Sequence, residues 1–457
     1  MDTSTPTTLV IFGASGDLTS RLLLPGLASL LAVEPERQVQ VVGADRSEMT
    51  EEQWRHTVRS ALAEAEVDAS RVEEVVESAQ YVQVDLLEAD QLASLLAGRG
   101  EGLVLYFALP PQVSVKLCAL LEGIDLPKDT RLALEKPFGH DYASAQQLNR
   151  QLLRVVAEER IHRVDHFLGV NTVLNLIGLR FANRLLQPLW SGEHIESVEI
   201  TYDEALALEG RAGYYDRAGA LVDMLQSHLL QVMAIFAMEA PSALTSVEVQ
   251  ALKAQVLRAT HVWQDDPIIA SRRARYTSGD IDDHTVPDYV DEDGVERQRK
   301  TETLAEVTLA IKNARWAGVP FRLRSGKALG HQAKRIVVTF RNPPHVPIGL
   351  VDTPEPDQLV LDLKPGAVSL WLSMNAEGDP FDLEQKQLRA EMGKPRMLPY
   401  GEVLAGIFDD DALLSIRGDV AEQCWRVMAP VLNAWRDDLV ALDTYPAGSA
   451  GPQGWAS

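Results

Sequence analysis

The sequence predicts two domains: an α/β domain built on a doubly wound parallel sheet, followed by an α+β domain with a large, mainly antiparallel sheet covered by helices. Over the first 165 residues, short apolar runs alternate with helical patterns. After residue 302, apolar runs instead follow one another with turn signals between them. A length of 457 residues also exceeds one average domain. We therefore predict domains at residues 1–165 and 166–457.

Composition limits the possible partners. The 66 acidic residues outnumber the 43 Lys and Arg residues and give a formal charge of −23. Such a surface repels nucleic acids and anionic membranes, so we predict neither as a partner. Two distant cysteines, Cys118 and Cys424, suit a reducing cytoplasm, and no His or Cys spacing suggests a metal site. Without a signal pattern or a membrane-length apolar run, we predict a cytoplasmic protein.

The first element is an apolar run, residues 8–12, which leads through a glycine turn into a helical pattern. Strand, glycine turn and helix together aim backbone N–H groups at a pyrophosphate, the arrangement of a Rossmann-like domain. The spacing is Gly-x-x-Gly and not the full fingerprint, so a tight turn without a ligand is the alternative. The predicted cofactor contacts in this turn are Gly13, Ser15, Gly16, Asp17 and Leu18.

The second predicted strand, residues 39–42, ends just before Asp45 and Arg46. At this place an acid accepts the ribose 2′-hydroxyl of NAD, whereas an arginine pairs with the 2′-phosphate of NADP. Both residue types are present, so both cofactors stay possible. A solvated surface pair is the alternative without a ligand.

Strands predicted at residues 81–84, 103–108 and 132–134 continue the parallel sheet. Lys136 follows the last of these, where it would face the ligand crevice; an ordinary surface lysine is the alternative. Next, Asp165 and His166 stand where a strand-like run gives way to a helical pattern. Catalytic groups collect at such junctions, although a capped turn has the same sequence.

The second domain begins with helical patterns at residues 171–186 and about 220–238 that flank an alternating run at 195–202. His228 lies at the margin of the second apolar stripe, and Asp223 and Ser227 share a face beside it; a core-edge histidine is the alternative. Residues 257–298 are polar and loop-like. The antiparallel strands are predicted at residues 303–312, 321–324, 335–341, 359–363 and 368–373.

Taken together, these segments resemble the glucose-6-phosphate dehydrogenase family almost from end to end. The matching segments are GASGDL at 13–18, ALPP at 108–111, EKPFG at 135–139, RVDH at 163–166, LRFANR at 179–184, QSHLLQ at 226–231, WAGVPF at 316–321, SGKAL at 325–329 and YPAGS at 445–449. Pro110, in the second segment, and Lys136 complete the cofactor contacts that we expect. The resemblance implies a homodimer or homotetramer.

The resemblance also implies a sugar dehydrogenase that moves hydride from C1 of a glucopyranose to NAD or NADP and leaves a 1,5-lactone. By similarity His228 is the general base and Asp165 the carboxylate that orients it. A neutral imidazole suits that task near neutral pH, and the acid stabilises the imidazolium as it forms. The residues expected to contact the sugar are Lys136, His166, Glu204, Asp223 and Lys327.

The chain departs from the family where the C6 phosphate is held. The family pattern Asp-His-Tyr-Leu-Gly-Lys keeps its histidine, His166, but Phe167 and Val170 replace the tyrosine and the lysine, and Leu22 replaces a further lysine. Phosphate recognition needs donors and cations, which apolar side chains do not supply. We therefore predict free glucose or a C6-modified glucose such as sulfoquinovose as the substrate.

Three alternatives or refinements accompany this prediction. Arg21 or Lys334 could replace the missing cations, in which case glucose 6-phosphate is the substrate. A non-catalytic sensor on the same fold is the alternative of another class, and the retained His228 and Asp165 argue against it. Because Asp45 precedes Arg46, we predict use of NAD equal to or better than that of NADP.

Overall fold

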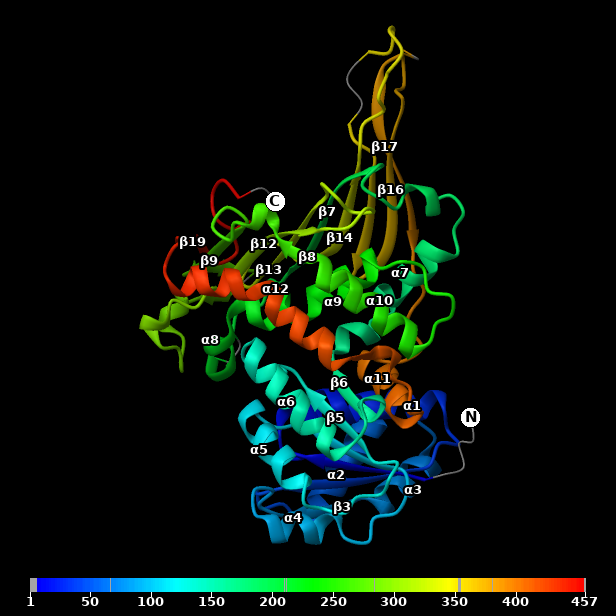
Figure 1. The fold of residues 1–457 in the computed structure, drawn as a ribbon, viewed down its shortest axis with the longest axis vertical. Helices are drawn as coiled ribbons and strands as arrows, with labels where there is room; N and C mark the ends of the chain where they lie inside the picture. The colour runs from blue at the N-terminus through cyan, green and yellow to red at the C-terminus, as the bar shows by residue number, and fades with distance from the viewer. Residues whose placement is uncertain are drawn as a thin grey trace. The chain divides into compact units, whose positions relative to one another are not determined.

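The structure is a computed structural model that describes residues 6–65, 67–208, 210, 212–282, 284–351, 355–379 and 381–455. It divides into two compact units (Figure 1). The first unit comprises Met1–Asn171, Pro241–Ala254 and Lys394–Trp425, and the second comprises Thr172–Ala240, Gln255–Gly393 and Arg426–Ser457. The boundary at 165/166 stays a prediction, and no local sequence pattern indicates that two later segments belong to the first unit.

The first unit is built on a parallel sheet with the strand order β3-β2-β1-β4-β5-β6, the order of a doubly wound dinucleotide-binding fold. Its strands are β1 (Thr7–Phe12), β2 (Val39–Asp45), β3 (Gln80–Gln83), β4 (Leu103–Phe107), β5 (Arg131–Glu135) and β6 (Ile161–Val164). Phe12 lies beside Ala44 of β2 and Phe107 of β4, so the carboxyl ends of these strands meet at one edge. The predicted fold class is thereby confirmed for this half of the chain.

Helices connect these strands and bury their apolar faces against the sheet. They are α1 (Leu24–Val33), α2 (Glu51–Ala63), α3 (Ala69–Ser78), α4 (Ala89–Leu96), α5 (Pro111–Leu121) and α6 (Tyr142–Val155). Capping boxes begin two of them: Thr50 with Gln53 for α2, and Asp141 with Ser144 for α6. Each box satisfies backbone N–H groups that would otherwise lack partners. The helix starts are therefore set by local sequence.

One further strand extends this sheet from the far end of the chain. β18 (Ser415–Ile416) runs antiparallel to β6 and pairs Ser415 with Val164. It lies between α11 (Pro399–Phe408) and α12 (Gly418–Arg436). This strand was not among those predicted for the sheet. The edge of β6 is covered by a segment that no local pattern connects to it.

The second unit contains a ten-stranded sheet. Nine of its strands lie in the order β17-β16-β15-β14-β7-β13-β12-β9-β19, and the tenth, β8, pairs with β12. Most neighbours are antiparallel, as predicted, but β7 pairs with β13 and β9 with β19 in parallel. The strands are β7 (Ile195–Asp203), β8 (Thr260–Val262), β9 (Ser271–Thr277), β12 (Leu304–Ile311), β13 (Pro320–Gly326), β14 (Ala333–Phe340), β15 (Gln358–Leu363), β16 (Gly366–Asn375), β17 (Leu383–Glu391) and β19 (Leu442–Pro446). β8 and β9, in a segment predicted as loop-like, were not expected, and neither were β17 and β19.

Helices of this unit include α7 (Asn171–Phe181), α8 (Ala212–Ala220) and α9 (Leu230–Ala237), and α10 (Ser246–Ala259) begins in the first unit. α9 packs on the sheet through Phe236, whose ring meets those of Trp316 and Phe321. The run Ala212–Ala237 is long and apolar enough to cross a membrane, but 83% of its most apolar window is buried inside the protein. Burial of that extent is what a core helix shows.

Candidate functional site

The glycine turn after β1 requires glycine at Gly13 for two reasons. Its φ of +85° lies in the left-handed region, and a Cβ there would stand 2.3 Å from the carbonyl oxygen of Ala108. The Gly13 carbonyl accepts hydrogen bonds from Gly16 N at 3.1 Å and from Thr19 Oγ1 at 3.2 Å. The chain thus turns tightly, and the helical run that starts at Asp17 presents its N-terminus at the sheet edge. Backbone N–H groups at such a helix N-terminus suit a phosphate ligand.

Asp45 is fixed against this turn. Its Oδ2 accepts hydrogen bonds from Ser15 N at 3.2 Å and from Ser15 Oγ at 2.8 Å, and its Oδ1 accepts one from Arg46 N at 2.6 Å. Tyr81 donates to the carbonyl of Ser47 at 2.7 Å, and burial together with the Asp45 charge raises the pKa of Tyr81 to about 12. The structure therefore brings Ser15 and Asp45 together, as a ribose site requires, while Arg46 is exposed beside them.

Two further predicted residues lie at neighbouring strand ends. Pro110 follows β4, and its carbonyl accepts from Val113 N at 2.9 Å at the start of α5. Lys136 follows β5 directly. Both therefore stand on the same carboxyl edge as the glycine turn, where ligands of doubly wound sheets bind.

Glu135, the last residue of β5, adds a carboxyl group to this edge, although it was not among the predicted site residues. Its Oε1 accepts hydrogen bonds from the hydroxyls of Tyr106 and, at 3.1 Å, Tyr400. Burial raises the pKa of Glu135 to about 7, although these hydrogen bonds oppose the change. The ring of Tyr400 stacks on His166, with centroids 5.6 Å apart and planes 15° apart. Tyr400 thus connects Glu135 to His166, a predicted sugar contact, although Tyr400 lies 234 positions after His166 in the chain.

Asp165 ends β6 and is fully buried. Its Oδ1 accepts a hydrogen bond from Phe167 N at 3.0 Å, which caps the short 3-10 helix His166–Gly169. Asp165 therefore caps a turn, which was the sequence-based alternative to a catalytic role. The same hydrogen bond holds the carboxylate in place. Phe167 is 5% exposed, so its ring is a core side chain, whereas Leu22 is 46% exposed in the π-helical turn Thr19–Leu23. Val170 follows the cap, and its amide donates to the carbonyl of Phe167 at 3.1 Å.

In the second unit, a carboxylate and two lysines meet where the parallel strands β7 and β13 end. Lys327 Nζ lies 2.8 Å from Glu204 Oε2, and Lys334 Nζ lies 3.6 Å from Glu204 Oε1. Lys334 also stands 4.5 Å from the centroid of the Tyr202 ring. The structure thereby joins the predicted pair Glu204 and Lys327, and it adds Lys334, which the sequence had suggested only as a replacement cation. Two ammonium groups against one carboxylate leave a net positive charge there.

His228 lies on a π-helical segment, Leu221–Leu229 (η5), in place of the regular helix that the sequence predicted. A π-helix bonds residue i to residue i+5, so Asp223 and His228, five apart, fall on the same side. In a regular helix they would diverge. His228 is 2% exposed, and Asp223 is partly exposed. Glu302 begins the segment by accepting a hydrogen bond from Leu221 N at 3.0 Å.

One histidine outside the predicted site is buried. His162 is fully buried, and its Nδ1 lies 3.0 Å from Ser415 Oγ. Burial, helped by Arg131 and Arg163, lowers the pKa of His162 to about 3, so it is neutral at physiological pH. His56 and His140 are exposed.

The predicted site residues are divided between the two units. The first unit contains the glycine turn, Asp45, Lys136, Asp165 and His166, and the second contains Glu204, Asp223, His228 and Lys327. Within each unit, these residues stand at strand ends or on one helix face. The pairing of Asp165 with His228 stays a prediction.

Two protein-family models match the chain: "Glucose-6-phosphate dehydrogenase, NAD binding domain" over residues 10–175 and "Glucose-6-phosphate dehydrogenase, C-terminal domain" over residues 177–457. The glucose-6-phosphate 1-dehydrogenase of Gluconobacter oxydans (strain 621H) is 39% identical over 98% of this chain and 95% of its own length. That of Rhizobium meliloti (strain 1021) is 35% identical over 98% of this chain and 94% of its own length.

Solved structures give the same result. The crystal structure of glucose-6-phosphate 1-dehydrogenase from Mycobacterium avium has a TM-score of 0.86 at 32% identity and covers 98% of this chain and 95% of its own. A glucose-6-phosphate dehydrogenase solved with its substrate glucose 6-phosphate has a TM-score of 0.86 at 28% identity and covers 98% of this chain and 96% of its own. The likeness therefore extends through both units.

Proposed function

Because the chain belongs to the glucose-6-phosphate dehydrogenase family, we propose that this oxidoreductase acts on glucose 6-phosphate itself and oxidises it at C1 to the 1,5-lactone. The observation that carries this proposal is the match over 98% of the chain to relatives with that name, including a structure solved with that sugar phosphate. Free glucose and sulfoquinovose, our predictions from Phe167, Val170 and Leu22, find no support among these relatives.

Two cations bear on the choice of sugar. Lys334 beside Glu204, and the exposed Arg21 on the first-unit turn, are cations that can take over part of the phosphate charge. We propose that they replace the two lysines that the family pattern carries.

We assign the chemistry to the predicted residues. His228 accepts the proton of the C1 hydroxyl while C1 loses hydride and the C1–O bond becomes a carbonyl. Asp165 orients the imidazole and stabilises the imidazolium. Lys136, His166, Glu204, Asp223 and Lys327 position the sugar. The strand, glycine turn and helix from β1 to Asp17 suit a dinucleotide pyrophosphate, and a bound nicotinamide would supply the hydride acceptor.

For the cofactor, we propose that NAD is used at least as well as NADP. Asp45 is held by Ser15 where the adenosine ribose is read, and a carboxylate there accepts the 2′-hydroxyl and repels a 2′-phosphate. Asp45→Ala should shift the ratio of kcat/KM values toward NADP by about tenfold or more, while Asp68→Ala, at another exposed aspartate of this unit, leaves the ratio unchanged. A wild-type enzyme that prefers NADP a hundredfold would disprove this assignment.

The substrate is tested by initial rates with glucose 6-phosphate, glucose and sulfoquinovose, each with both cofactors. We expect the highest kcat/KM with glucose 6-phosphate. The double variant Phe167→Tyr with Val170→Lys, compared with His140→Asn as a surface control, should change KM for glucose 6-phosphate more than kcat. A clear preference for either other sugar would return the assignment to a C6-modified or free glucose.

Turnover is tested separately from binding. His228→Asn should lower kcat by about 10²- to 10⁴-fold with little change in the Kd for the sugar phosphate, because a general base acts in the transition state. A wild-type protein that binds the sugar phosphate in calorimetry but reduces neither cofactor would instead be the non-catalytic sensor. We further propose that the protein is cytoplasmic and forms a homodimer or homotetramer. Sedimentation equilibrium measures the oligomeric state directly.

A further inference from the structure

Lys253, on α10, is a buried lysine that the proposed chemistry does not use. Its side chain is 1% exposed, and within the described part of the chain its Nζ has no hydrogen-bond partner. A charged group in that position is costly unless an opposite charge lies close by. Lysines are rarely buried in this way, so the position calls for an explanation.

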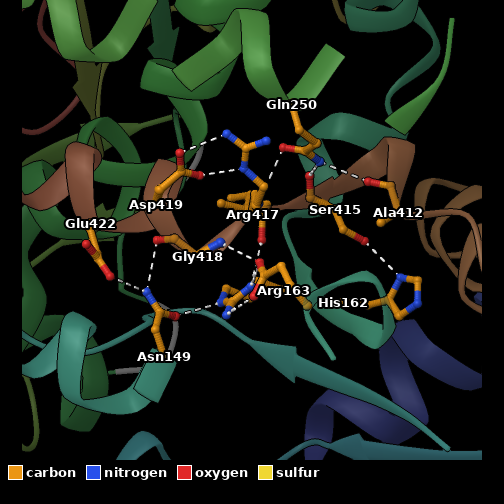
Figure 2. Close-up of polar contacts among 12 residues, drawn as sticks. Asn149, His162, Arg163, Gln250, Ala412, Ser415, Arg417, Gly418, Asp419 and Glu422 are labelled. Carbon is orange, nitrogen blue, oxygen red and sulfur yellow. Dashed lines mark hydrogen bonds and ion pairs between the residues drawn. The ribbon is translucent and has the colours of Figure 1, made fainter. Parts of the chain in front are cut away.

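The surrounding contacts place Lys253 at the end of β6. Gln250 lies one turn earlier on the same helix face and donates through Nε2 to the carbonyls of Ser415 and, at 2.9 Å, of Ala412 (Figure 2). Ser415 pairs with Val164, the residue before Asp165. The face of α10 that bears Gln250 and Lys253 therefore covers the carboxyl end of β6.

Charges around Lys253 agree with this placement. Burial lowers the pKa of Lys253 to about 8, the Asp165 carboxylate and Cys424 act to raise it, and Arg417 acts to lower it. Asp165 is thus close enough to interact electrostatically with the ammonium, and both groups are buried, which strengthens the attraction. At neutral pH, Lys253 is predominantly protonated.

On its other side Asp165 faces groups that disfavour its charge. The charge of Asp165 raises the pKa of Glu135 on β5 and that of Tyr400 on α11. Two neighbouring carboxyl groups resist ionising together. The ammonium of Lys253 favours the charge on Asp165, whereas that of Lys136 favours the charge on Glu135.

We propose that Lys253 is a positioning residue whose ammonium keeps Asp165 ionised and in place, so that Asp165 can orient the proton-accepting histidine. This inference rests on the proposed function for its catalytic consequence. Its electrostatic part, the ionisation of Asp165, depends only on the first unit.

The variants Lys253→Met and Lys253→Arg test it, with the exposed Lys116→Met as the matched control. In Lys253→Met we expect kcat to fall by about tenfold or more, KM for glucose 6-phosphate to change by less than about threefold, and the acid limb of kcat/KM to move up by roughly one to three pH units. Lys253→Arg should restore most of the rate, and Lys116→Met should match the wild type.

Infrared difference spectroscopy gives a readout without substrate. At pH 7, Lys253→Met should show a protonated carboxylic acid band in addition to those of the wild type, to which Glu135 contributes, and the additional band should disappear when Asp165→Asn is added. An unchanged pH profile and no new band would overturn the proposal, as would a loss of folding stability alone. If Lys253→Met does not fold, Lys253→Gln is judged by the same criteria.

The two proposals fail in distinguishable ways. A wild type that does not oxidise glucose 6-phosphate, together with the expected infrared band, removes the proposed function and leaves the ion pair. Normal oxidation of the sugar phosphate without the band removes the role of Lys253 alone.

Discussion

Glu135 and Asp165 are two carboxyl groups of the first unit with different neighbours. Burial raises the pKa of Glu135 to about 7 from its ordinary value of 4.5, while the hydroxyls of Tyr106 and Tyr400 and the ammonium of Lys136 oppose the change. Asp165 lies close enough to Lys253 to interact with its ammonium. Divergent surroundings of this kind are how one site holds a proton on one acid and a charge on the next.

Glu135→Gln is expected to change how stability depends on pH. A carboxyl whose pKa is raised on folding binds more protons in the folded state, so its stabilisation is complete below about pH 4.5 and is lost as the pH rises to about 7. The loss is on the order of 3 kcal/mol for the wild type. Glu135→Gln should lack this decline in denaturant unfolding at pH 4.5–8, while Glu122→Gln, at a group outside the cluster, should keep it. Parallel profiles for wild type and Glu135→Gln would contradict the shift.

Asn149 connects the first-unit helix α6 to the returning C-terminal segment (Figure 2). Its amide donates to the Gly418 carbonyl at 2.9 Å and to Glu422 Oε1 at 2.8 Å, and its Oδ1 accepts from Arg163 Nε at 3.0 Å. Arg163 is fully buried and also pairs with Glu158 at 2.8 Å. The amide therefore satisfies a buried guanidinium and holds two distant segments at once.

Asn149→Leu should destabilise the first unit by roughly 3 kcal/mol, because it leaves buried polar groups of Arg163 without a partner. The control is Gln146→Leu on the same helix, which removes only a 3.4 Å contact to Glu422 and one exposed bond to Tyr142. Denaturant unfolding followed by Trp fluorescence measures both. Equal losses in the two variants would show that the buried amide has no special role.

At the scale of elements, Gly219 separates α8 from the π-helical segment η5. Its φ of +66° and ψ of 174° suit glycine, and a Cβ there would lie 2.3 Å from Glu302 Oε1. The same carboxylate accepts the hydrogen bond from Leu221 N that begins η5. Glycine at position 219 thus leaves room for the Glu302 carboxylate, which accepts the first hydrogen bond of the segment that carries Asp223 and His228.

Gly219→Ala should cost about 3 kcal/mol, since it combines backbone strain with displacement of Glu302. Gly210→Ala is a matched control: Gly210 also has a positive φ, +77°, but a Cβ there meets nothing within 4 Å. We expect the control to lose only about 1 kcal/mol in thermal unfolding. A larger effect of Gly210→Ala than of Gly219→Ala would refute this account of the register.

Sequence periodicity predicted the parallel sheet of the first unit and most strands of the second, because apolar alternation is a local property. It missed β8, β9, β17, β18 and β19, and it missed Glu135 as a site residue. β18 is only two residues long, and the partner Tyr400 of Glu135 lies 265 positions away. The π-helical segment also escaped prediction, and Glu302, which accepts the hydrogen bond from its first residue, comes from another part of the chain. Local signals define elements, whereas distant contacts define register and protonation.

At the scale of the whole molecule, the charge of −23 makes self-repulsion a general destabilising factor. Raising NaCl from about 20 mM to about 300 mM shortens the Debye length and should raise the unfolding midpoint. Exposed ion pairs are weakened too, but each contributes little. KCl at the same ionic strength should act equally. A midpoint that falls with both salts would show that ion pairs outweigh the repulsion.

The return of Lys394–Trp425 to the first unit has a consequence for the order of events during synthesis. β6 leaves the ribosome about 250 residues before β18, which at roughly 5–20 residues per second is an interval of about 10 to 50 seconds. Throughout that time the edge of β6 is open to pairing with another nascent chain. Pairing between neighbouring nascent chains on one messenger RNA would therefore lower the yield of folded protein. Chaperones that keep these chains apart would raise it.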